Sequence, residues 1–247
     1  MKTPNKNAPC QRLLLPFAAV LAVAAACSSQ AVSYHETVLA DKPAAYYRLE
    51  EPASSFTITN AVNPDAYQGT VIYDDYGVWP KFQQAGVGSN SVSFHLYTPE
   101  GGTAQKSHIE VPYAAELNPE GPFTAECWAR VTSWGSVVRC IVGNVGDFSH
   151  GWWFRQEAGT TPRWLWVQNG GGIYMAGGSI TKNEWAHLVV TYDGTKSYFY
   201  ANGKEEWSSG GIPAPNSGGP LSIGGTPVLS EEFFDGSVDE VAVYTNS

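Results

Sequence analysis

Apolar and polar residues alternate most clearly over Trp185–Trp207, which reads WAHLVVTYDGTKSYFYANGKEEW. Apolar side chains at every second position are typical of a strand that buries one of its faces. Asp193-Gly194 and Asn202-Gly203 are dipeptides whose backbones tolerate positive φ, as tight hairpin turns require. The segment is therefore predicted to form a hairpin with a second turn at its end. It holds no cluster of His, Cys, Ser or acidic residues such as a reaction would need, which indicates a scaffold.

Short apolar runs bounded by Gly, Pro, Asn or Asp continue along the chain after residue 43, and no eleven-residue window has a helical period. Many short strands at steady spacing are typical of a sandwich or jelly roll. The predicted fold class is all-β, a two-sheet antiparallel jelly-roll sandwich in a single domain. The predicted strands lie within residues 44–51, 70–78, 91–97, 107–113, 122–131, 137–144, 151–156, 162–168, 185–192, 196–201, 219–225 and 234–244. The strands at 151–156 and 162–168 are expected to pair with each other.

The first 26 residues have the pattern of a secretory signal. Two lysines and one arginine precede an apolar run, Leu13–Ala26, whose length of about 14 residues is short for a bilayer span. These residues are therefore excluded from the fold. Residues 27–42 are interpreted as a leader or linker, and the jelly-roll domain is expected over residues 43–247.

The cleavage site leaves two alternatives. The sequence AAAC, followed by SSQ, resembles a bacterial lipoprotein signal, in which Cys27 becomes the lipidated first residue. Ordinary cleavage near Ala26 or Ala31 is the other alternative. Both predict a bacterial protein that is secreted or is a lipoprotein of the outer envelope, in an oxidising compartment, with membrane contact only through a lipid anchor.

Composition limits the kinds of partner. Hydrophobic residues make up 43% of the chain, which excludes disorder, and 26 Gly, 16 Pro and 32 aromatic residues (9 Trp, 13 Tyr, 10 Phe) are typical of a turn-rich extracellular β protein. Without the first 26 residues, 11 basic residues (14 − 3) stand against 23 acidic ones, a net charge of −12. Such a surface repels phosphate backbones, so nucleic acid is excluded as a partner.

Two cysteines belong to the predicted domain, Cys127 in FTAECWARV and Cys140 in VVRCIVGN. If these two strands form a hairpin around residues 132–135, the cysteines lie opposite each other. A disulfide there would close a short loop and stabilise the fold by about 3 kcal/mol in the chain-entropy model. The alternative is two buried, unlinked thiols. A metal site is not indicated, since no other Cys and no spaced His joins them.

Four segments, in order, resemble the laminin-G-like and concanavalin A-like jelly-roll superfamily, in the form common in bacterial envelope proteins. They are AAYYRLEE, PFTAECWARV, WAHLVVTYDGTKSYFYANG, and LSIGG followed by FDGSVDEVAVY. The resemblance covers roughly residues 40–244 and implies two antiparallel sheets whose first and last strands are adjacent. Members include carbohydrate-binding modules, adhesion domains and a few glycosidases and lyases, so the fold does not settle the function.

The resemblance also implies a structural Ca²⁺ between the first and last strands, held by a carboxylate of the final strand and by backbone oxygens. Asp239 matches that carboxylate. Glu50, Asn60 and Asp65 are the candidate partners from the N-terminal segment, although Asn60 stands where relatives often carry an acid. The alternative is that Asp239 only caps or hydrogen-bonds the neighbouring turn.

Catalysis is not indicated by the residue types. Retaining glycosidases of the superfamily carry two carboxylates on one strand in an E-x-D-x-x-E arrangement, so that both face the cleft. This chain has no such run, and the side chains of the adjacent pair Asp239 and Glu240 are expected to point to opposite faces of a strand. The five histidines are scattered, and His187 is interpreted as a hydrogen-bonded core residue. The chain is therefore not expected to be an enzyme.

Aromatic residues carry the binding hypothesis. Nine tryptophans are more than a core of this size needs, and sugars stack their apolar faces on indole or phenol rings. Of two adjacent tryptophans in HGWWFRQ, one should face away from the core, and the two in RWLWVQ share one face of a strand. The candidate carbohydrate contacts are Trp152, Trp153, Arg155, Trp164 and Trp166.

The sequence therefore predicts a non-enzymatic recognition module of the cell envelope or secretome, which binds carbohydrate or glycoconjugate. One alternative is a structural or protein-interaction domain of a surface assembly, with a surface protein as its partner. A glycoside hydrolase or polysaccharide lyase of the same fold is a further alternative, and its weakness is the missing pair of carboxylates.

Overall fold

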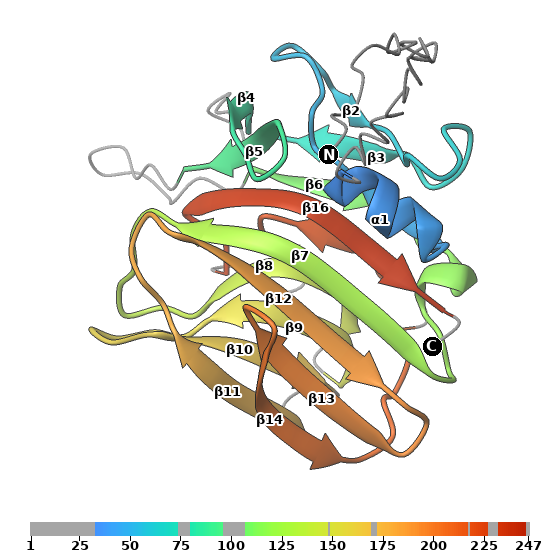
Figure 1. The fold of residues 1–247 in the computed structure, drawn as a ribbon, viewed down its shortest axis with the longest axis vertical. Coiled ribbons are helices and arrows are strands. Elements are labelled where there is room, and N and C mark those ends of the chain that lie inside the picture. The colour runs from blue at the N-terminus through green and yellow to red at the C-terminus, as the bar shows by residue number, and fades with distance from the viewer. Residues whose placement is uncertain are drawn as a thin grey trace, which may run out of the picture. The chain divides into compact units, whose positions relative to one another are not determined.

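Two antiparallel sheets packed face to face form the described part of the protein, as the alternation of apolar residues predicted (Figure 1). The computed structural model describes residues 33–73, 80–95, 107–147, 149–168, 172–216, 218–226 and 232–245. The predicted signal and the predicted lipidation site Cys27 lie outside these ranges. Within them, no helix is long and apolar enough to cross a membrane.

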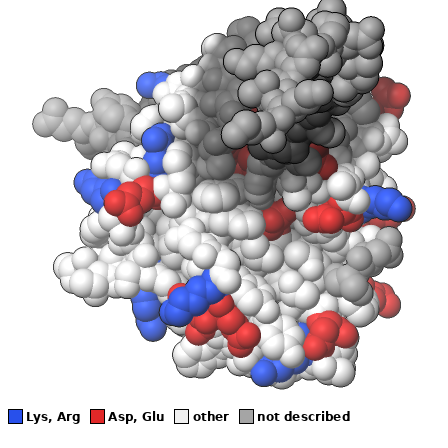
Figure 2. Space-filling model, viewed as in Figure 1, with Lys and Arg blue, Asp and Glu red and all other residues white. Residues whose placement is uncertain are grey.

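Sheet A has the strand order β14-β13-β12-β7-β16-β5-β4, and β1 pairs with β16. The first and last strands are therefore neighbours, as the family resemblance implied. Its strands are β1 (Ala45–Tyr47), β4 (Lys81–Ala85), β5 (Asn90–Phe94), β7 (Phe123–Val131), β12 (Trp185–Tyr192), β13 (Lys196–Ala201), β14 (Lys204–Gly210) and β16 (Gly236–Tyr244). On the side seen in Figure 2, with sheet A in front, acidic and basic side chains are interspersed.

Sheet B lies behind sheet A in Figure 1 and has the order β11-β10-β9-β8-β15-β6-β3-β2. Its strands are β2 (Thr57–Ile58), β3 (Gly69–Ile72), β6 (His108–Val111), β8 (Arg139–Asp147), β9 (His150–Gln156), β10 (Arg163–Gln168), β11 (Ile173–Ser179) and β15 (Leu221–Ile223). A 3₁₀ turn, η1 (Ala115–Leu117), follows β6. The core lies between the two sheets, and alternate residues of the long strands enter it.

The predicted hairpin is confirmed as β12 and β13, which pair antiparallel. At its turn, Asp193 Oδ1 accepts hydrogen bonds from the backbone N–H groups of Thr195 and Lys196, each at 2.8 Å. The second turn contains Asn202 at φ +53° and Gly203 at φ +75°, and it leads into β14. Asn202-Gly203 therefore has both residues at positive φ, as predicted, whereas at the first turn only Gly194 has a positive φ, +97°.

The predicted hairpin of the two cysteine-bearing strands is wrong. β7 pairs with β12 and β16 in sheet A, whereas β8 pairs with β9 and β15 in sheet B. Cys127 points into the core between the sheets, and Cys140 belongs to a separate apolar cluster on the outer side of sheet B. Both thiols are free and buried, which agrees with the alternative of unlinked cysteines. The segment 132–138 crosses from one sheet to the other instead of turning back.

The sequence did not predict the helix α1 (Tyr34–Ala40), which lies within the expected leader. Ser33 Oγ accepts a hydrogen bond from Glu36 N at 3.2 Å, and Glu36 Oε2 accepts one from Ser33 N at 2.9 Å, so the two residues form a capping box. Val38 packs against Tyr46 of β1 on the outer side of sheet A. Part of the predicted leader therefore belongs to the folded domain.

Candidate functional site

The outer side of β9, β10 and β11 is the part of the molecule that best fits the predicted binding site. The three strands are paired in register, and Val167 of β10 lies opposite both Trp153 of β9 and Tyr174 of β11. Directly opposed residues point to the same face of a sheet. The residues that define this β9–β11 face are Trp153, Arg155, Glu157, Arg163, Leu165, Val167, Tyr174 and Ala176.

Three predicted carbohydrate contacts point away from this face. Trp152, Trp164 and Trp166 are buried in the core between the sheets, and the rings of Trp152 and Trp166 stack at 5.2 Å between centroids. Their prediction as sugar contacts is wrong, because a ring enclosed between two sheets presents no surface to a ligand. Leu165 and Val167 make the other face of β10 equally apolar, so alternation could not say which face is inner.

Trp153 faces outward, as one of the two adjacent tryptophans was expected to, but it is buried in the apolar cluster on the outer side of sheet B. Gly143 of β8 lies opposite it, and a Cβ on this glycine would come within 3.2 Å of Trp153 Cδ1. The Arg155 guanidinium lies 5.7 Å from the centroid of the indole ring, in cation–π geometry. Trp153 therefore packs against the Arg155 guanidinium and is not an exposed stacking ring.

Arg155 is also held by Glu232, whose carboxylate accepts a hydrogen bond from Arg155 Nη2. Burial raises the pKa of the Glu232 carboxyl, and Arg155 opposes this increase. Arg155 Nε, Glu232 Oε2 and Trp153 Nε1 are buried without a hydrogen-bond partner in the described part of the chain. An unpaired buried polar group costs about 1–3 kcal/mol, so the Arg155–Glu232 pair is held at some cost in stability.

Tyr174 supplies the exposed ring that the buried tryptophans do not. The residue is 49% exposed. Burial raises the pKa of the Tyr174 hydroxyl, the Glu157 carboxylate adds to the increase, and Arg155 and Arg163 oppose it. The phenol is thus within electrostatic reach of both arginines of the β9–β11 face.

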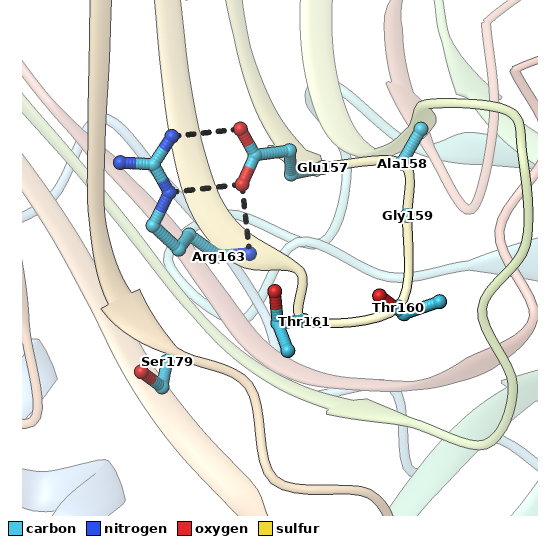
Figure 3. A pocket seen from close by; sticks show the side chains of 7 residues that line it. All are labelled: Glu157, Ala158, Gly159, Thr160, Thr161, Arg163 and Ser179. Carbon is cyan, nitrogen blue, oxygen red and sulfur yellow. Dashed lines mark hydrogen bonds and ion pairs between the residues drawn. The ribbon is translucent and has the colours of Figure 1, made fainter.

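A polar hollow of about 620 Å³ lies at the β9–β10 connection, beside the end of β11. Figure 3 shows Glu157 and Arg163 joined side by side along its rim, with Nε to Oε2 at 2.9 Å and Nη2 to Oε1 at 2.8 Å. This bidentate geometry fixes the planes of both groups. The hollow is lined by Glu157, Ala158, Gly159, Thr160, Thr161, Arg163 and Ser179.

The face therefore combines an exposed phenol ring, two arginine–carboxylate pairs and several hydroxyl groups. Of the five predicted contacts, Arg155 is the one placed among these groups with part of its surface exposed. Sequence reasoning missed Tyr174, Glu157 and Arg163. Alternation from Arg155 across the paired strands β9 and β10 could have found Glu157 and Arg163, since that pairing was predicted. Nothing in GIYMAGG singled out Tyr174.

The four predicted calcium ligands are not assembled around one point. Asn60 is buried, and its Oδ1 already accepts from Tyr46 N at 3.0 Å and Val62 N at 3.1 Å, while Asp65 is exposed. Within the described residues, no group of three His, Cys, Asp or Glu side chains is suited to a metal ion. Asp239 and Glu50 are near enough to interact electrostatically. Calcium binding stays a prediction, and Asp239 and Glu50 are the two of its proposed ligands that lie near each other.

The final strand carries a bulge that turns Asp239 and Glu240 to the same side, against the expectation of opposite faces. The register shifts between Asp239 and Ala242, and Glu240 has φ +51°. Asp239 is 0% exposed, and its Oδ2 accepts from Val87 N at 2.8 Å. Burial raises the pKa of Asp239 to about 8, against the hydrogen bond from Val87. Glu240 is also buried and accepts a hydrogen bond from the Tyr46 hydroxyl.

His187 is hydrogen-bonded, as expected, but it lies on the outer side of sheet A and is only partly buried. Its Nε2 lies 2.7 Å from Glu126 Oε2, and its ring stacks on Trp128 at 4.8 Å. Tyr34 of α1 packs edge-on against both rings, and Tyr244 donates to Glu126 Oε1 at 2.5 Å. This cluster holds α1 against sheet A.

Comparison with known proteins gives one match to a family model and several to solved structures. Residues 101–247 match the model Laminin_G_3, described as the concanavalin A-like lectin/glucanases superfamily. No curated protein matches the sequence. Domain 4 of AbnA, a GH43 extracellular arabinanase from Geobacillus stearothermophilus solved with arabinotriose, is similar with a TM-score of 0.60 at 17% identity, over 83% of this chain and 92% of that one.

Two further structures are similar over only part of their own length. The binding domain of Paraclostridial Mosquitocidal Protein 1 has a TM-score of 0.59 at 16% identity, over 85% of this chain and 50% of that one. Trypanosoma rangeli sialidase in complex with sialic acid has a TM-score of 0.56 at 12% identity, over 81% of this chain and 30% of that one. At these identities the likeness shows the fold.

Proposed function

This chain belongs to the concanavalin A-like lectin/glucanases superfamily, and from that premise we propose that it is a non-enzymatic module that binds carbohydrate or glycoconjugate through the β9–β11 face. The observation that carries the proposal is Tyr174, an exposed ring within electrostatic reach of Arg155, Arg163 and Glu157. The arabinotriose in the complex of the arabinanase domain supports a glycan as the class of ligand.

The chemistry of the face suits a sugar. A pyranose or furanose ring offers an apolar C–H side, which stacks on a phenol ring, and hydroxyl groups around its edge. Arginine supplies only donors and a carboxylate only acceptors, so the more exposed pair Arg163–Glu157 offers both kinds of partner to such hydroxyls, and Arg155 adds a second guanidinium. Because ion pairs already fix these side chains, little side-chain entropy is lost when a sugar binds.

Tyr174→Ala is expected to weaken binding about tenfold, since it removes the exposed stacking ring of the face. Affinity gel electrophoresis through arabinan, xylan, β-glucan and starch, followed by a glycan array, measures this. Tyr113→Ala is the matched control, because Tyr113 is a 42% exposed tyrosine outside the face, and it should bind like the wild type. A wild type that no glycan retards, or a Tyr174→Ala variant that binds normally, contradicts the proposal.

The non-enzymatic part of the proposal is supported by the placement of the acids. The bulge brings Asp239 and Glu240 to one side of sheet A, but both are buried and hydrogen-bonded, so they offer no pair of carboxyls to a glycosidic bond. Release of reducing ends from any of the polysaccharides that bind would contradict it. Self-association without any response to glycans would instead favour the alternative of a structural or protein-interaction domain.

We also propose that the module works outside the cytoplasm, either secreted or held to the outer envelope through Cys27. The support is the signal pattern of the first 26 residues. In a bacterial host the wild type is expected to sediment with membranes and Cys27→Ser to remain soluble. Mass spectrometry that finds no lipid on Cys27 would contradict the anchor and leave ordinary secretion.

A further inference from the structure

Every charged side chain of the β9–β11 face is already paired within the protein. Arg163 gives three hydrogen bonds to one carboxylate: its Nε and its backbone N–H reach Glu157 Oε2 at 2.9 and 3.2 Å, and its Nη2 reaches Oε1 at 2.8 Å (Figure 3). Arg155 Nη2 donates to Glu232. The side chains of Arg155 and Glu232 are 16% and 15% exposed, against 47% for Arg163 and 23% for Glu157. The charged pair that a ligand meets is therefore Arg163–Glu157.

This exposed pair carries no net charge at neutral pH. The hydrogen bonds from Arg163 lower the pKa of the Glu157 carboxyl, and the same bonds raise the pKa of the Arg163 guanidinium. Both groups therefore stay ionised, and their charges cancel. The hollow beside them is neutral as well, because its other lining residues are uncharged: Ala158, Gly159, Thr160, Thr161 and Ser179.

An acidic group on a ligand gains little from such a surface. Glu157 occupies the Nε–Nη2 edge of Arg163, one of the edges at which a guanidinium binds a carboxylate through two parallel hydrogen bonds. An anion on the other side of the guanidinium lies within about 8 Å of the Glu157 carboxylate, the Debye length at physiological salt, so the two charges repel each other. The net charge of the chain, which is negative, adds to this repulsion.

We propose that the β9–β11 face selects neutral glycans against acidic ones, and that Glu157 is the residue that determines this selectivity. The inference rests on the proposed function, since it names the class of glycan that the same site binds. Glu157 cancels the charge of Arg163 and occupies its bidentate edge. Without the Glu157 charge, Arg163 would be an exposed, uncompensated guanidinium, which is the residue type that best binds the carboxylate of a uronic acid or the sulfate of a sulfated sugar.

Chemically matched glycans separate charge from shape. The polysaccharide that retards the protein most, among arabinan, xylan, β-glucan and starch, is prepared in a carboxymethylated form and, at equal substitution, in an uncharged hydroxyethylated form. In affinity gels the wild type is expected to bind the hydroxyethylated form at least about tenfold more tightly than the carboxymethylated form. In Glu157→Gln, which keeps the shape of the side chain and removes its charge, this ratio should fall to about threefold or less.

Glu205→Gln is the matched control variant. Glu205 is an exposed acid of β14 that lies opposite Tyr200 on the outer side of sheet A, away from the β9–β11 face. The substitution changes the net charge of the protein by the same amount as Glu157→Gln, and it should leave the ratio of the two affinities at the wild-type value. A ratio that falls equally in both variants would assign the selectivity to net charge and overturn the role of Glu157.

The outcomes distinguish this inference from the proposed function. If the wild type binds both forms equally, or prefers the carboxymethylated form, the proposed function stands and the selectivity is wrong; this comparison needs no variant. An unchanged ratio in Glu157→Gln, in a variant whose urea unfolding midpoint matches that of the wild type, also overturns the role of Glu157. If the wild type binds no glycan, the proposed function fails and the inference fails with it.

Discussion

Replacing Trp166 by alanine is expected to lower the free energy of unfolding by about 3–5 kcal/mol, as for other large aromatic residues removed from a core. Trp166 is 0% exposed and packs against Trp152 and Phe154, with ring centroids at 5.2 and 4.9 Å. Its Nε1 also donates to Gln168 Oε1 at 2.7 Å, so the substitution removes one hydrogen bond of a buried amide. Urea unfolding, followed by far-ultraviolet circular dichroism, measures the change.

Trp207→Ala is the matched control for this experiment, because it removes the same side chain from a half-exposed position on an edge strand. It should change the free energy of unfolding by no more than about 0.5 kcal/mol. The two variants thus separate the core tryptophans from the exposed one. A Trp166→Ala variant that is as stable as the wild type but does not bind glycans would contradict this account. It would make Trp166 a carbohydrate contact, as the sequence analysis predicted.

Stability is expected to fall as the pH rises from about 4 to about 8, measured in EDTA. Burial raises the pKa of Asp239 to about 8 from its ordinary value of 3.8. In this range the folded protein keeps the proton that the unfolded chain has lost, so unfolding releases a proton and becomes easier with increasing pH. Each unit of pKa difference corresponds to about 1.4 kcal/mol, so the loss is on the order of a few kcal/mol.

Asp239→Asn should reduce this pH dependence, since the amide keeps the shape of the carboxyl and does not titrate, while the raised pKa values of Glu240 and Glu232 leave a smaller dependence in the same direction. Asp65→Asn, which changes an exposed acid, should leave the pH dependence of stability unchanged. Added Ca²⁺ at pH 8 is expected to raise the melting temperature of the wild type and not that of Asp239→Asn, if the calcium prediction is right. A wild type whose stability is constant between pH 4 and 8 contradicts the account of Asp239.

The sequence predicted those parts of the fold in which turn residues and apolar alternation are enough to fix the structure. The β12–β13 hairpin follows from Asp193-Gly194 and Asn202-Gly203, since few other structures accept two such turns at that spacing. The pairing of β9 with β10 and the neighbouring first and last strands were also predicted. These features depend on short-range backbone geometry or on the whole pattern of the family.

Features that depend on long-range packing were missed. The segment after β7 contains a plausible turn, but whether a chain turns back or crosses to the other sheet is decided by which strands lie beside it. α1 has only seven residues, too few for a helical period to show. The bulge at Glu240 places a residue other than glycine at positive φ, which is rare enough that no sequence pattern indicates it.

The binding face was missed for a related reason. β10 is apolar on both sides, because the core covers Trp164 and Trp166 while the outer cluster contains Leu165 and Val167. Counting tryptophans therefore selected the rings that hold the sheets together. Tyr174 differs from them only in its exposure, which depends on its position on the edge strand β11.

The most direct test of the central claim is a two-dimensional ¹⁵N–¹H NMR titration of the protein with the glycan that retards it most in the affinity gel. We predict that the backbone signals of Tyr174, Arg155 and Arg163 and the indole signal of Trp153 shift, while the indole signals of Trp164 and Trp166 stay in place. Shifts confined to the outer side of sheet A, around Trp128 and His187, would contradict the assignment of the site to the β9–β11 face.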